Sequence, residues 1–357
     1  MSEQRTSPAA AAAPGNPAPG GPAPDRLNIA VIGLGWWGRV IVPLAQSSTQ
    51  LRVVKVAHSN IAAAEEFARA HNVDLVVGLE PVLQDPRVHA VVLCTPHTRH
   101  ADQIVAAANA GKHVFCEKPL TLTRADALRA VAACEANKVV LAVGHERRFE
   151  PPIIEAMRLI HSGELGAPLQ FEGTFTQDLF LSLPAGNWRL SGKEAPAGPM
   201  TATGVHMLDL AIAVFGEAHS AYASMKQLGS HLSNGDTLAA LVNFKQGGHA
   251  LISAILATPF AGRFAVYGSK GWVEVRDKTH PGAPEGWVLT RCERGGRAHS
   301  EEFAPAPGVL RNLEAFAAAA TGRSPYPVSH GEMVANIAAL EAIIRSIASG
   351  QVEAVEG

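Results

Sequence analysis

The sequence has few aromatic residues, few charges and no block of charges of one sign, and these scarcities exclude several classes of protein. Only 6% of its 357 residues are aromatic and 17% are charged, with 30 Lys and Arg against 32 Asp and Glu. A protein whose charges are dispersed and balanced lacks the basic surface patch that binds nucleic acids and anionic membranes. We therefore expect a small-molecule ligand, and no nucleic-acid or membrane partner.

Cysteines and long apolar runs are also scarce. The four cysteines show no Cys-x-x-Cys spacing and are too sparse for a disulfide-rich secreted fold; they are Cys94, Cys116, Cys134 and Cys292. Gly, Pro or a charged residue interrupts every hydrophobic run before it reaches the roughly 20 residues of a membrane span. These features favour a cytoplasmic protein in a reducing compartment.

The chain divides into a tail and two regions that differ in the pattern of their apolar segments. Residues 1–26 are mostly Ala, Pro and Gly, a composition that predicts a disordered tail. Short apolar runs alternate with helix-length segments from 27 to 150, which predicts a parallel sheet covered by helices on both faces. From 151 to 357 the runs follow one another on short turns, which predicts an antiparallel sheet, and two helices close the chain. We predict an α/β protein of two domains.

A glycine-rich turn follows the first predicted strand and opens the first predicted helix. It reads Gly33-Leu34-Gly35-Trp36-Trp37-Gly38, a G-x-G-x-x-G pattern. The first glycine permits the tight turn, the second lets the backbone approach a pyrophosphate, and the third lets the helix pack closely on the strand. The helix N-terminus adds free N–H groups and positive potential. In this strand-turn-helix setting the motif predicts a dinucleotide site.

The end of the second predicted strand bears on the choice of dinucleotide. A site specific for NAD would place Asp or Glu there, about 20 residues past the turn, to hold the ribose hydroxyls. The chain has His58-Ser59-Asn60 instead. Nothing there repels a 2′-phosphate, and Ser59 and Asn60 can donate hydrogen bonds to it, so the sequence slightly favours NADP. NAD remains open, and His58 as a solvated strand-end residue is the alternative.

Three further segments give the chain its resemblance to a known family. They are Thr95-Pro96 with His100, then Glu117-Lys118-Pro119, and finally the segment from Gly204 to Asp209 that contains His206. With the glycine-rich turn they resemble the Gfo/Idh/MocA family of glucose-fructose oxidoreductase and inositol 2-dehydrogenase. The resemblance implies a Rossmann NAD(P)-binding domain at 27–150. It also implies a substrate-binding domain at 151–357, built on a large, mostly antiparallel open-faced sheet that often makes dimer or tetramer contacts.

The resemblance implies that Lys118 and His206 handle a hydroxyl proton. An ammonium beside the oxygen stabilises the developing alkoxide, and an imidazole is a suitable acid-base near pH 7. The chain departs from inositol dehydrogenase-like members, which carry Asp four residues before this histidine, because Ala202 stands there. Asp209 is a partial substitute or a partner of the helix backbone. With no such carboxylate, two alternatives remain open. Lys118 is the main group that transfers the proton, or His206 has only a structural role.

Further residues are predicted to contact the cofactor or the substrate. The predicted cofactor contacts, beyond the two segments above, are Thr95, Pro96, His97, His100, Glu117 and Lys118. Predicted substrate contacts are Lys118, Arg147, Arg148, Trp188, Arg189, His206 and Asp209. The alternative for the arginine pair is that one of them forms an ion pair with Glu146 or Glu150. His97 and His100 have no third ligand at a recognisable spacing, so we expect no metal.

These residues predict an NAD(P)-dependent dehydrogenase or reductase acting on a CH–OH group of a sugar, polyol or related cyclic compound, in a homodimer or homotetramer. Two other functions stay open. One is a lyase or glycosidase that uses tightly bound NAD for transient oxidation of its substrate. The other is a non-catalytic, dinucleotide-dependent sensor, against which the presence of Lys118 counts.

Overall fold

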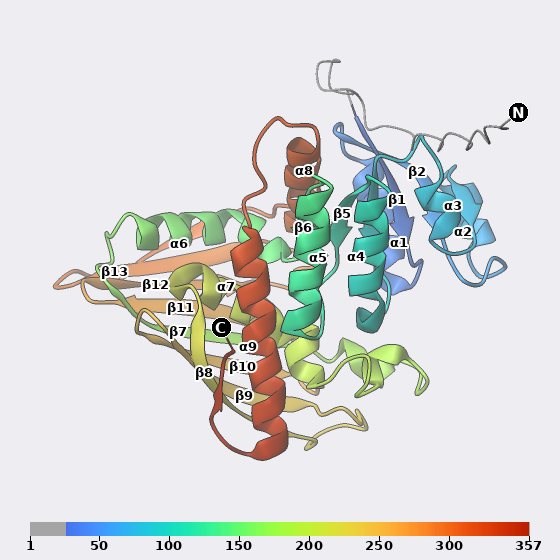
Figure 1. Ribbon diagram of the computed structural model, residues 1–357. Helices are drawn as coiled ribbons and strands as arrows, with labels where there is room; N and C mark the ends of the chain where they lie inside the picture. The colour runs from blue at the N-terminus through green and yellow to red at the C-terminus, as the bar shows by residue number, and fades with distance from the viewer. Residues whose placement is uncertain (1–25, 357) are drawn as a thin grey trace, which may run out of the picture.

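Two β-sheets organise residues 26–356, the part of the chain that the computed structural model describes (Figure 1). One sheet has six strands and the other has nine. Residues 1–25 of the predicted disordered tail lie outside the described residues, whereas Arg26 donates a hydrogen bond from Nε to the carbonyl of Thr49. The layout confirms the predicted α/β fold.

The six-stranded sheet has the order β3-β2-β1-β4-β5-β6, and all its neighbouring strands are parallel. Its strands are β1 (Leu27–Ile32), β2 (Leu51–Ala57), β3 (Asp74–Val76), β4 (Ala90–Leu93), β5 (His113–Cys116) and β6 (Leu141–Val143). Side chains on both faces are buried, as the two-sided apolar runs predict. The strand order reverses between β1 and β4, and at such a point a ligand binds beyond the carboxyl ends of the strands.

Helices cover both faces of this sheet. They are α1 (Trp36–Gln46), α2 (Glu65–Ala70), α3 (Glu80–Leu83), α4 (His100–Asn109) and α5 (Arg124–Ala136). Thr123 caps α5 by accepting a hydrogen bond from the N–H of Asp126, as the Thr-x-x-Asp spacing predicts. On the α1 face the sheet is also covered by α8 (Gly308–Ala320), where Phe316 meets Phe115 of β5. A helix from the predicted second domain thus packs on the first sheet.

The nine-stranded sheet has the order β14-β13-β12-β11-β7-β10-β9-β8-β15. Its strands are β7 (Pro168–Thr176), β8 (Ala218–Lys226), β9 (Thr237–Phe244), β10 (His249–Ile255), β11 (Ala261–Gly268), β12 (Gly271–Asp277), β13 (Trp287–Glu293), β14 (His299–Phe303) and β15 (Glu353–Ala354). Only β7 and β10 pair in parallel; every other pair is antiparallel. The sheet is therefore mixed and mostly antiparallel, as predicted, although β13, β14 and β15 were not expected.

Three helices pack on one face of this larger sheet: α6 (Pro151–His161), α7 (Val205–Phe215) and α9 (His330–Ser349) (Figure 1). Alternate side chains on the strands are buried beneath them, while others, such as Tyr222 and Leu251, stay exposed. The nonpolar core under these helices continues into the α4 and α5 face of the first sheet. Within residues 26–356, none of the helices combines the length and hydrophobicity that crossing a bilayer requires.

Candidate active site

A different structural feature explains why each position of the G-x-G-x-x-G turn is a glycine. Gly33 has φ +96°, which disfavours any residue with a side chain, and a Cβ on it would lie 2.7 Å from the carbonyl oxygen of Cys94. A Cβ on Gly38 would lie 2.0 Å from the carbonyl oxygen of Gly33, so α1 packs on β1 only without one. A Cβ on Gly35, by contrast, would meet no atom within 4 Å. The space at Gly35 fits a phosphate group approaching the backbone.

The start of α1 also suits an anion. Its N-cap residue is Gly35, which offers no side-chain cap, so the first N–H groups of the helix have no such partner. The side chain of Leu34 is buried in the core, which leaves only its backbone for a cofactor contact. Trp36, which is 53% exposed, and Trp37 both line the adjoining cavity, and the buried indole N–H of Trp37 has no hydrogen-bond partner. The turn therefore fits the dinucleotide that its sequence predicts.

Two alanine substitutions separate the packing role of these glycines from the binding role. Gly35→Ala should lower the free energy of unfolding by about 1 kcal/mol or less yet weaken NADH binding about tenfold or more, because the methyl group would meet only the ligand. Gly38→Ala should instead destabilise the fold by about 1 to 3 kcal/mol through the clash with Gly33. Urea unfolding and NADH fluorescence titration measure the two effects. Unchanged NADH binding by Gly35→Ala would show that a phosphate group does not contact the backbone of this turn.

The His58-Ser59-Asn60 segment forms a turn between β2 and α2. The ring of His58 accepts a hydrogen bond from the N–H of Asn60, and the Asn60 side chain accepts one from the N–H of Ala63. Arg39 of α1 reaches the same turn, where its Nη2 donates to the carbonyl of Ala63. No arginine follows the strand directly in the sequence; the one at this turn comes from the neighbouring helix α1.

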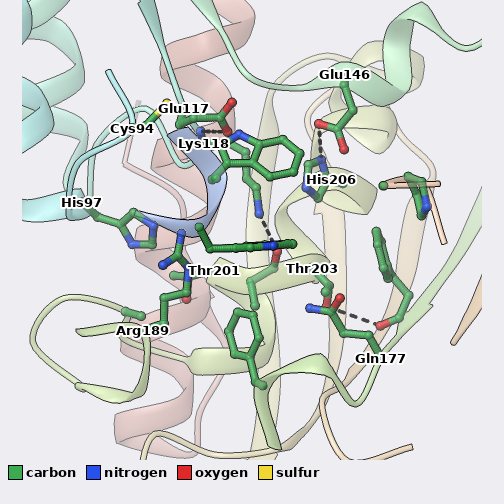
Figure 2. Close-up of a pocket in the computed structure, with 18 of the residues that line it drawn as sticks. Cys94, His97, Glu117, Lys118, Glu146, Gln177, Arg189, Thr201, Thr203 and His206 are labelled. Carbon is green, nitrogen blue, oxygen red and sulfur yellow. Dashed lines mark hydrogen bonds and ion pairs between the residues drawn. The ribbon is translucent and has the colours of Figure 1, made fainter. Parts of the chain in front are cut away.

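One cavity lies between the carboxyl ends of the first-sheet strands and the segment that precedes α7 (Figure 2). It is lined by many of the predicted site residues, namely Trp36, Trp37, Thr95, His97, His100, Glu117, Lys118, Trp188, Arg189 and His206. It adjoins the glycine-rich turn through the two tryptophans. The structure thus brings the predicted cofactor turn and the two predicted catalytic residues together.

Lys118 follows β5 and extends into this cavity. Its Nζ donates a hydrogen bond of 2.5 Å to the carbonyl oxygen of Ala202 on the opposite wall (Figure 2). Burial lowers the pKa of Lys118, an effect that the carboxylates of Glu146 and Glu117 oppose. An ammonium group in this poorly solvated position has a strong field on any oxygen that binds beside it.

His206 enters the cavity from the opposite side, in the first turn of α7. A π-helical segment, Met200–Gly204, leads directly into that turn and places Thr201, Ala202 and Thr203 on the cavity wall. Burial, reinforced by the charge of Lys118, holds the pKa of His206 well below its usual value. The imidazole is therefore neutral near pH 7 and able to accept a proton.

Glu146 is a cavity residue whose place the sequence did not reveal. It begins the short helix Glu146–Phe149 after β6, and its Oε2 lies 3.6 Å from Nδ1 of His206 (Figure 2). Burial raises the pKa of Glu146 to about 7, against the lowering influence of Lys118. The sequence offers Glu146 only as a partner for a neighbouring arginine, whereas in the structure its carboxylate lies within ion-pair distance of His206.

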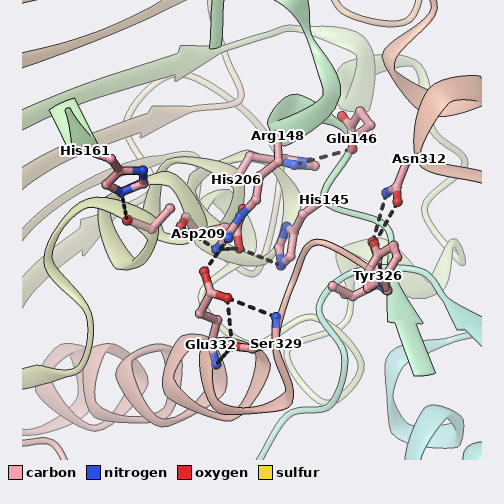
Figure 3. A network of polar contacts seen from close by, with 12 residues as sticks. His145, Glu146, Arg148, His161, His206, Asp209, Asn312, Tyr326, Ser329 and Glu332 are labelled. Carbon is pink, nitrogen blue, oxygen red and sulfur yellow. Dashed lines mark hydrogen bonds and ion pairs between the residues drawn. The ribbon is translucent and has the colours of Figure 1, made fainter. Parts of the chain in front are cut away.

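Arg147, Arg148 and Asp209, which the sequence predicted to contact the substrate, do not line the cavity. Arg147 is fully buried and bonds to Asp277 at 2.7 Å. Arg148 bonds to both carboxylate oxygens of Asp209 and also to Glu332 (Figure 3). Arg147 also lies 3.3 Å from Glu150, as the pairing alternative expected for one arginine, whereas the partners of Arg148 are neither Glu146 nor Glu150.

The loop between β7 and α7 closes the cavity on another side. Its Trp188 packs edge-on against His97 with ring centres 4.8 Å apart, and the Arg189 guanidinium lies over the Trp188 ring. Nδ1 of His97 lies 2.8 Å from the carbonyl of Glu194 in the same loop. Trp188 and Arg189 thus line the cavity, and their contact with a substrate stays a prediction.

The predicted cofactor contacts after β4 divide into two groups. Thr95, His97 and His100 line the cavity, whereas Pro96 does not. His100 is buried, with one ring nitrogen 3.0 Å from the carbonyl of Thr95 and the other 3.0 Å from that of Pro119. This arrangement ties the two loops together. Across residues 26–356, no three His, Cys, Asp or Glu side chains are grouped to hold a metal ion.

Two further cavity residues, Gln177 and His280, were missed because they lie far apart in sequence. Nε2 of His280 lies 2.9 Å from Oε1 of Gln177, and Nδ1 of His280 accepts the N–H of Gly282. The second bond fixes the tautomer, so His280 donates to Gln177 and leaves the amide NH2 of Gln177 free. The cavity thus contains an oriented donor for a polar ligand.

Comparisons with known proteins identify the family of the chain. Residues 27–145 match the profile described as "Oxidoreductase family, NAD-binding Rossmann fold", and residues 153–274 match the Gfo/Idh/MocA C-terminal domain. Inositol 2-dehydrogenase of Rhizobium meliloti is 26% identical over 90% of this chain and 97% of that protein. The scyllo-inositol 2-dehydrogenase (NAD(+)) of Bacillus subtilis is 35% identical over 43% of this chain and 45% of that protein.

A solved structure shares the fold over nearly the whole described chain. Levoglucosan dehydrogenase in complex with NADH and levoglucosan superimposes with a TM-score of 0.81 at 21% identity, covering 93% of this chain and 100% of that one. The two profile matches follow each other along the chain, and the first contains the glycine-rich turn and Lys118. The protein belongs to the Gfo/Idh/MocA family of NAD(P)-dependent oxidoreductases.

Proposed function

We propose that the protein is a dehydrogenase or reductase that moves a hydride between a nicotinamide cofactor and a secondary hydroxyl or ketone of a sugar, polyol or related cyclic compound. The observation that carries the proposal is that Lys118 and His206 enter one cavity from opposite walls beside the glycine-rich turn. The relatives named above support the substrate class, since their names specify inositols and levoglucosan.

Lys118 and His206 have different roles in the removal of the hydroxyl proton. The nicotinamide ring supplies the hydride acceptor when the cofactor is bound. His206, neutral because burial lowers its pKa, takes the proton from the hydroxyl. The Lys118 ammonium stabilises the negative charge that develops on the oxygen. In the reductive direction His206 first takes up a proton from solvent and then gives it to the carbonyl oxygen, beside the Lys118 ammonium.

We also propose a slight preference for NADP over NAD. The turn after β2 carries His58, Ser59 and Asn60 and no carboxylate that would repel a 2′-phosphate. Ser59 is exposed, and the guanidinium of Arg39 lies at the same turn. Fluorescence titrations with NADH and NADPH compare the two affinities, and tighter NADH binding would reverse the preference.

A further proposal concerns assembly. The exposed side of the nine-stranded sheet, with Tyr222 and Leu251, is suited to pack against a second copy of the chain as a homodimer or homotetramer. Sedimentation velocity of the purified protein measures this directly, and a monomer at micromolar concentration would contradict it.

The experiment for the proposed function is a substrate panel. The purified protein is mixed with NAD or NADP and with sugars, inositols, cyclic diols or hydroxy acids, and the absorbance of the reduced nicotinamide is followed. Substrate-dependent formation of reduced cofactor supports a dehydrogenase. Cofactor that survives purification, with product formed and no net reduced cofactor, would indicate the transient-oxidation lyase or glycosidase instead. Ligand responses that survive Lys118→Ala, with no turnover in wild type, would indicate a sensor.

A further inference from the structure

Two buried groups of the cavity face each other without an established bond. Nδ1 of His206 has no hydrogen-bond partner, and Oε2 of Glu146 lies 3.6 Å away from it. The side chains are only 5% and 12% exposed, so water compensates neither of them well. Figure 2 and Figure 3 both show the carboxylate pointing at the imidazole ring. A shift of well under 1 Å would give a charge-assisted hydrogen bond.

The other carboxylates near this histidine are already engaged. Asp209, one turn further along α7, accepts bonds from Nε and Nη2 of Arg148 at 2.7 and 2.8 Å. Glu150 lies 3.3 Å from Arg147. Position 202, one helical turn before His206, is an alanine and supplies no carboxylate. Glu146 is thus the carboxylate that remains for the Nδ1 side of the ring.

We propose that Glu146 is the positioning residue of His206. Its carboxylate accepts a hydrogen bond from the N–H at Nδ1 and so leaves Nε2 as the nitrogen that exchanges a proton with the substrate. This inference rests on the proposed function and specifies how that site is built. A neutral imidazole carries its single proton on either nitrogen, and the hydrogen bond made by one nitrogen decides which of them is free. Hydrogen bonds of this kind are often long before substrate binds and tighten in the complex.

The arginine pairs explain why Glu146 is held in place. Glu146 starts the short helix Glu146–Phe149, and the next two residues are Arg147 and Arg148. Arg147 fastens this helix to Asp277 at the end of β12, and Arg148 fastens it to α7 and α9. The short helix that carries Glu146 is therefore tied by an ion pair to α7, the helix that carries His206. The arginines that do not reach the substrate act instead on the position of this carboxylate.

The charged groups around the ring determine the conditions for a test. His206 is faced by Lys118 from the end of β5, by His145 and Arg147 beside Glu146, and by His280 from the loop after β12. With burial, these groups hold the pKa of His206 far below its usual value, so the ring stays neutral above pH 7.

The protonation state of the Glu146 carboxyl group sets the lowest pH at which the same test can be made. Burial raises the pKa of Glu146 to about 7, so its carboxylate is ionised at about pH 9 and can accept a hydrogen bond. Below pH 7 the protonated carboxyl would instead donate a hydrogen bond to an unprotonated Nδ1. The measurement is therefore made at about pH 9.

The test is nitrogen NMR of the 15N-labelled protein, in which the imidazole shifts distinguish the Nδ1–H from the Nε2–H tautomer. The His206 signals are assigned by their loss in His206→Asn. We expect the Nδ1–H tautomer in the wild type and a change toward Nε2–H in Glu146→Leu. Glu117→Gln is the matched control, because it removes another buried cavity carboxylate near Lys118 and should leave the His206 tautomer unchanged.

The outcomes separate this inference from the proposed function, because the spectrum needs no substrate. An Nε2–H tautomer in the wild type, or an Nδ1–H tautomer that persists in folded Glu146→Leu, would overturn the role of Glu146 even if the protein is a dehydrogenase. If Glu146→Leu does not fold, the wild-type spectrum alone still decides. With a turned-over substrate, we also expect Glu146→Leu to lower kcat about 10- to 100-fold at unchanged NADH affinity.

Discussion

Lys118→Met is expected to lower kcat by about three orders of magnitude while leaving NADH affinity nearly unchanged. Methionine keeps much of the length of the side chain but removes the ammonium that donates to the carbonyl of Ala202 and faces His206. The charge that stabilises the developing alkoxide is then lost from a buried site, where water cannot replace it. Steady-state kinetics and NADH fluorescence titration measure the two quantities.

Lys112 provides the matched control for this substitution. It is also a largely buried lysine that donates to backbone carbonyls, in this case those of Asp85 and Val88, but it lies outside the cavity. Lys112→Met should lower the stability and leave kcat within about twofold. A Lys118→Met protein that keeps wild-type turnover would show that this ammonium takes no part in the reaction.

The second large effect concerns stability. Asp277→Ala is expected to lower the free energy of unfolding by about 3 to 5 kcal/mol. Asp277 bonds to Arg147 at 2.7 Å, and each side chain is 1% exposed, so removing the carboxylate leaves a buried guanidinium short of a partner. The indole N–H of Trp287 loses its acceptor as well. Urea unfolding followed by tryptophan fluorescence and circular dichroism measures the change.

Asp74→Ala is the control for that experiment. Asp74 bonds to Arg87 at the same distance of 2.7 Å, but the two side chains are 54% and 59% exposed. Solvent screens such a pair, and its loss should change the stability by less than about 1 kcal/mol. Similar effects for the two substitutions would refute the view that Arg147 depends on a buried partner.

The sequence predicted the first sheet well because its signals are local. Most of the parallel strands are short apolar runs followed by a helix-length segment, and Thr123 marks the start of α5. The exception is β3, which is followed by the four-residue α3 that the sequence did not predict. The edge strands of the second sheet were harder. The side chains of β14 are nearly all exposed, and β15 has two residues, so neither carries a burial pattern that the sequence could reveal. Only the pairing with neighbouring strands defines them.

The same distinction applies to the site. The glycine-rich turn, Lys118 and His206 belong to motifs that can be recognised from adjacent residues, and they meet in one cavity. The roles of Arg147 and Arg148 depended on contacts with Asp277 and Glu332, which lie 130 and 184 residues further along the chain. No local pattern encodes those pairs.

Glu146 was missed for the same reason. Its neighbours in sequence offered two arginines as partners, and only the fold gives each arginine a different carboxylate. The Gln177 and His280 pair joins two loops that are 103 residues apart. Long-range ion pairs thus decide which polar residues are left to face the cavity, and this is the part of the site that motif spacing does not contain.

The central claim is that one cavity takes both the nicotinamide and the hydroxyl compound, between Lys118 and His206. A crystal structure of the protein with NADH tests it most directly. We predict the pyrophosphate against the turn from Gly33 to Gly38 and the nicotinamide ring in the cavity lined by Lys118 and His206. A nicotinamide ring bound elsewhere, or a dinucleotide that does not touch the glycine-rich turn, would contradict the account.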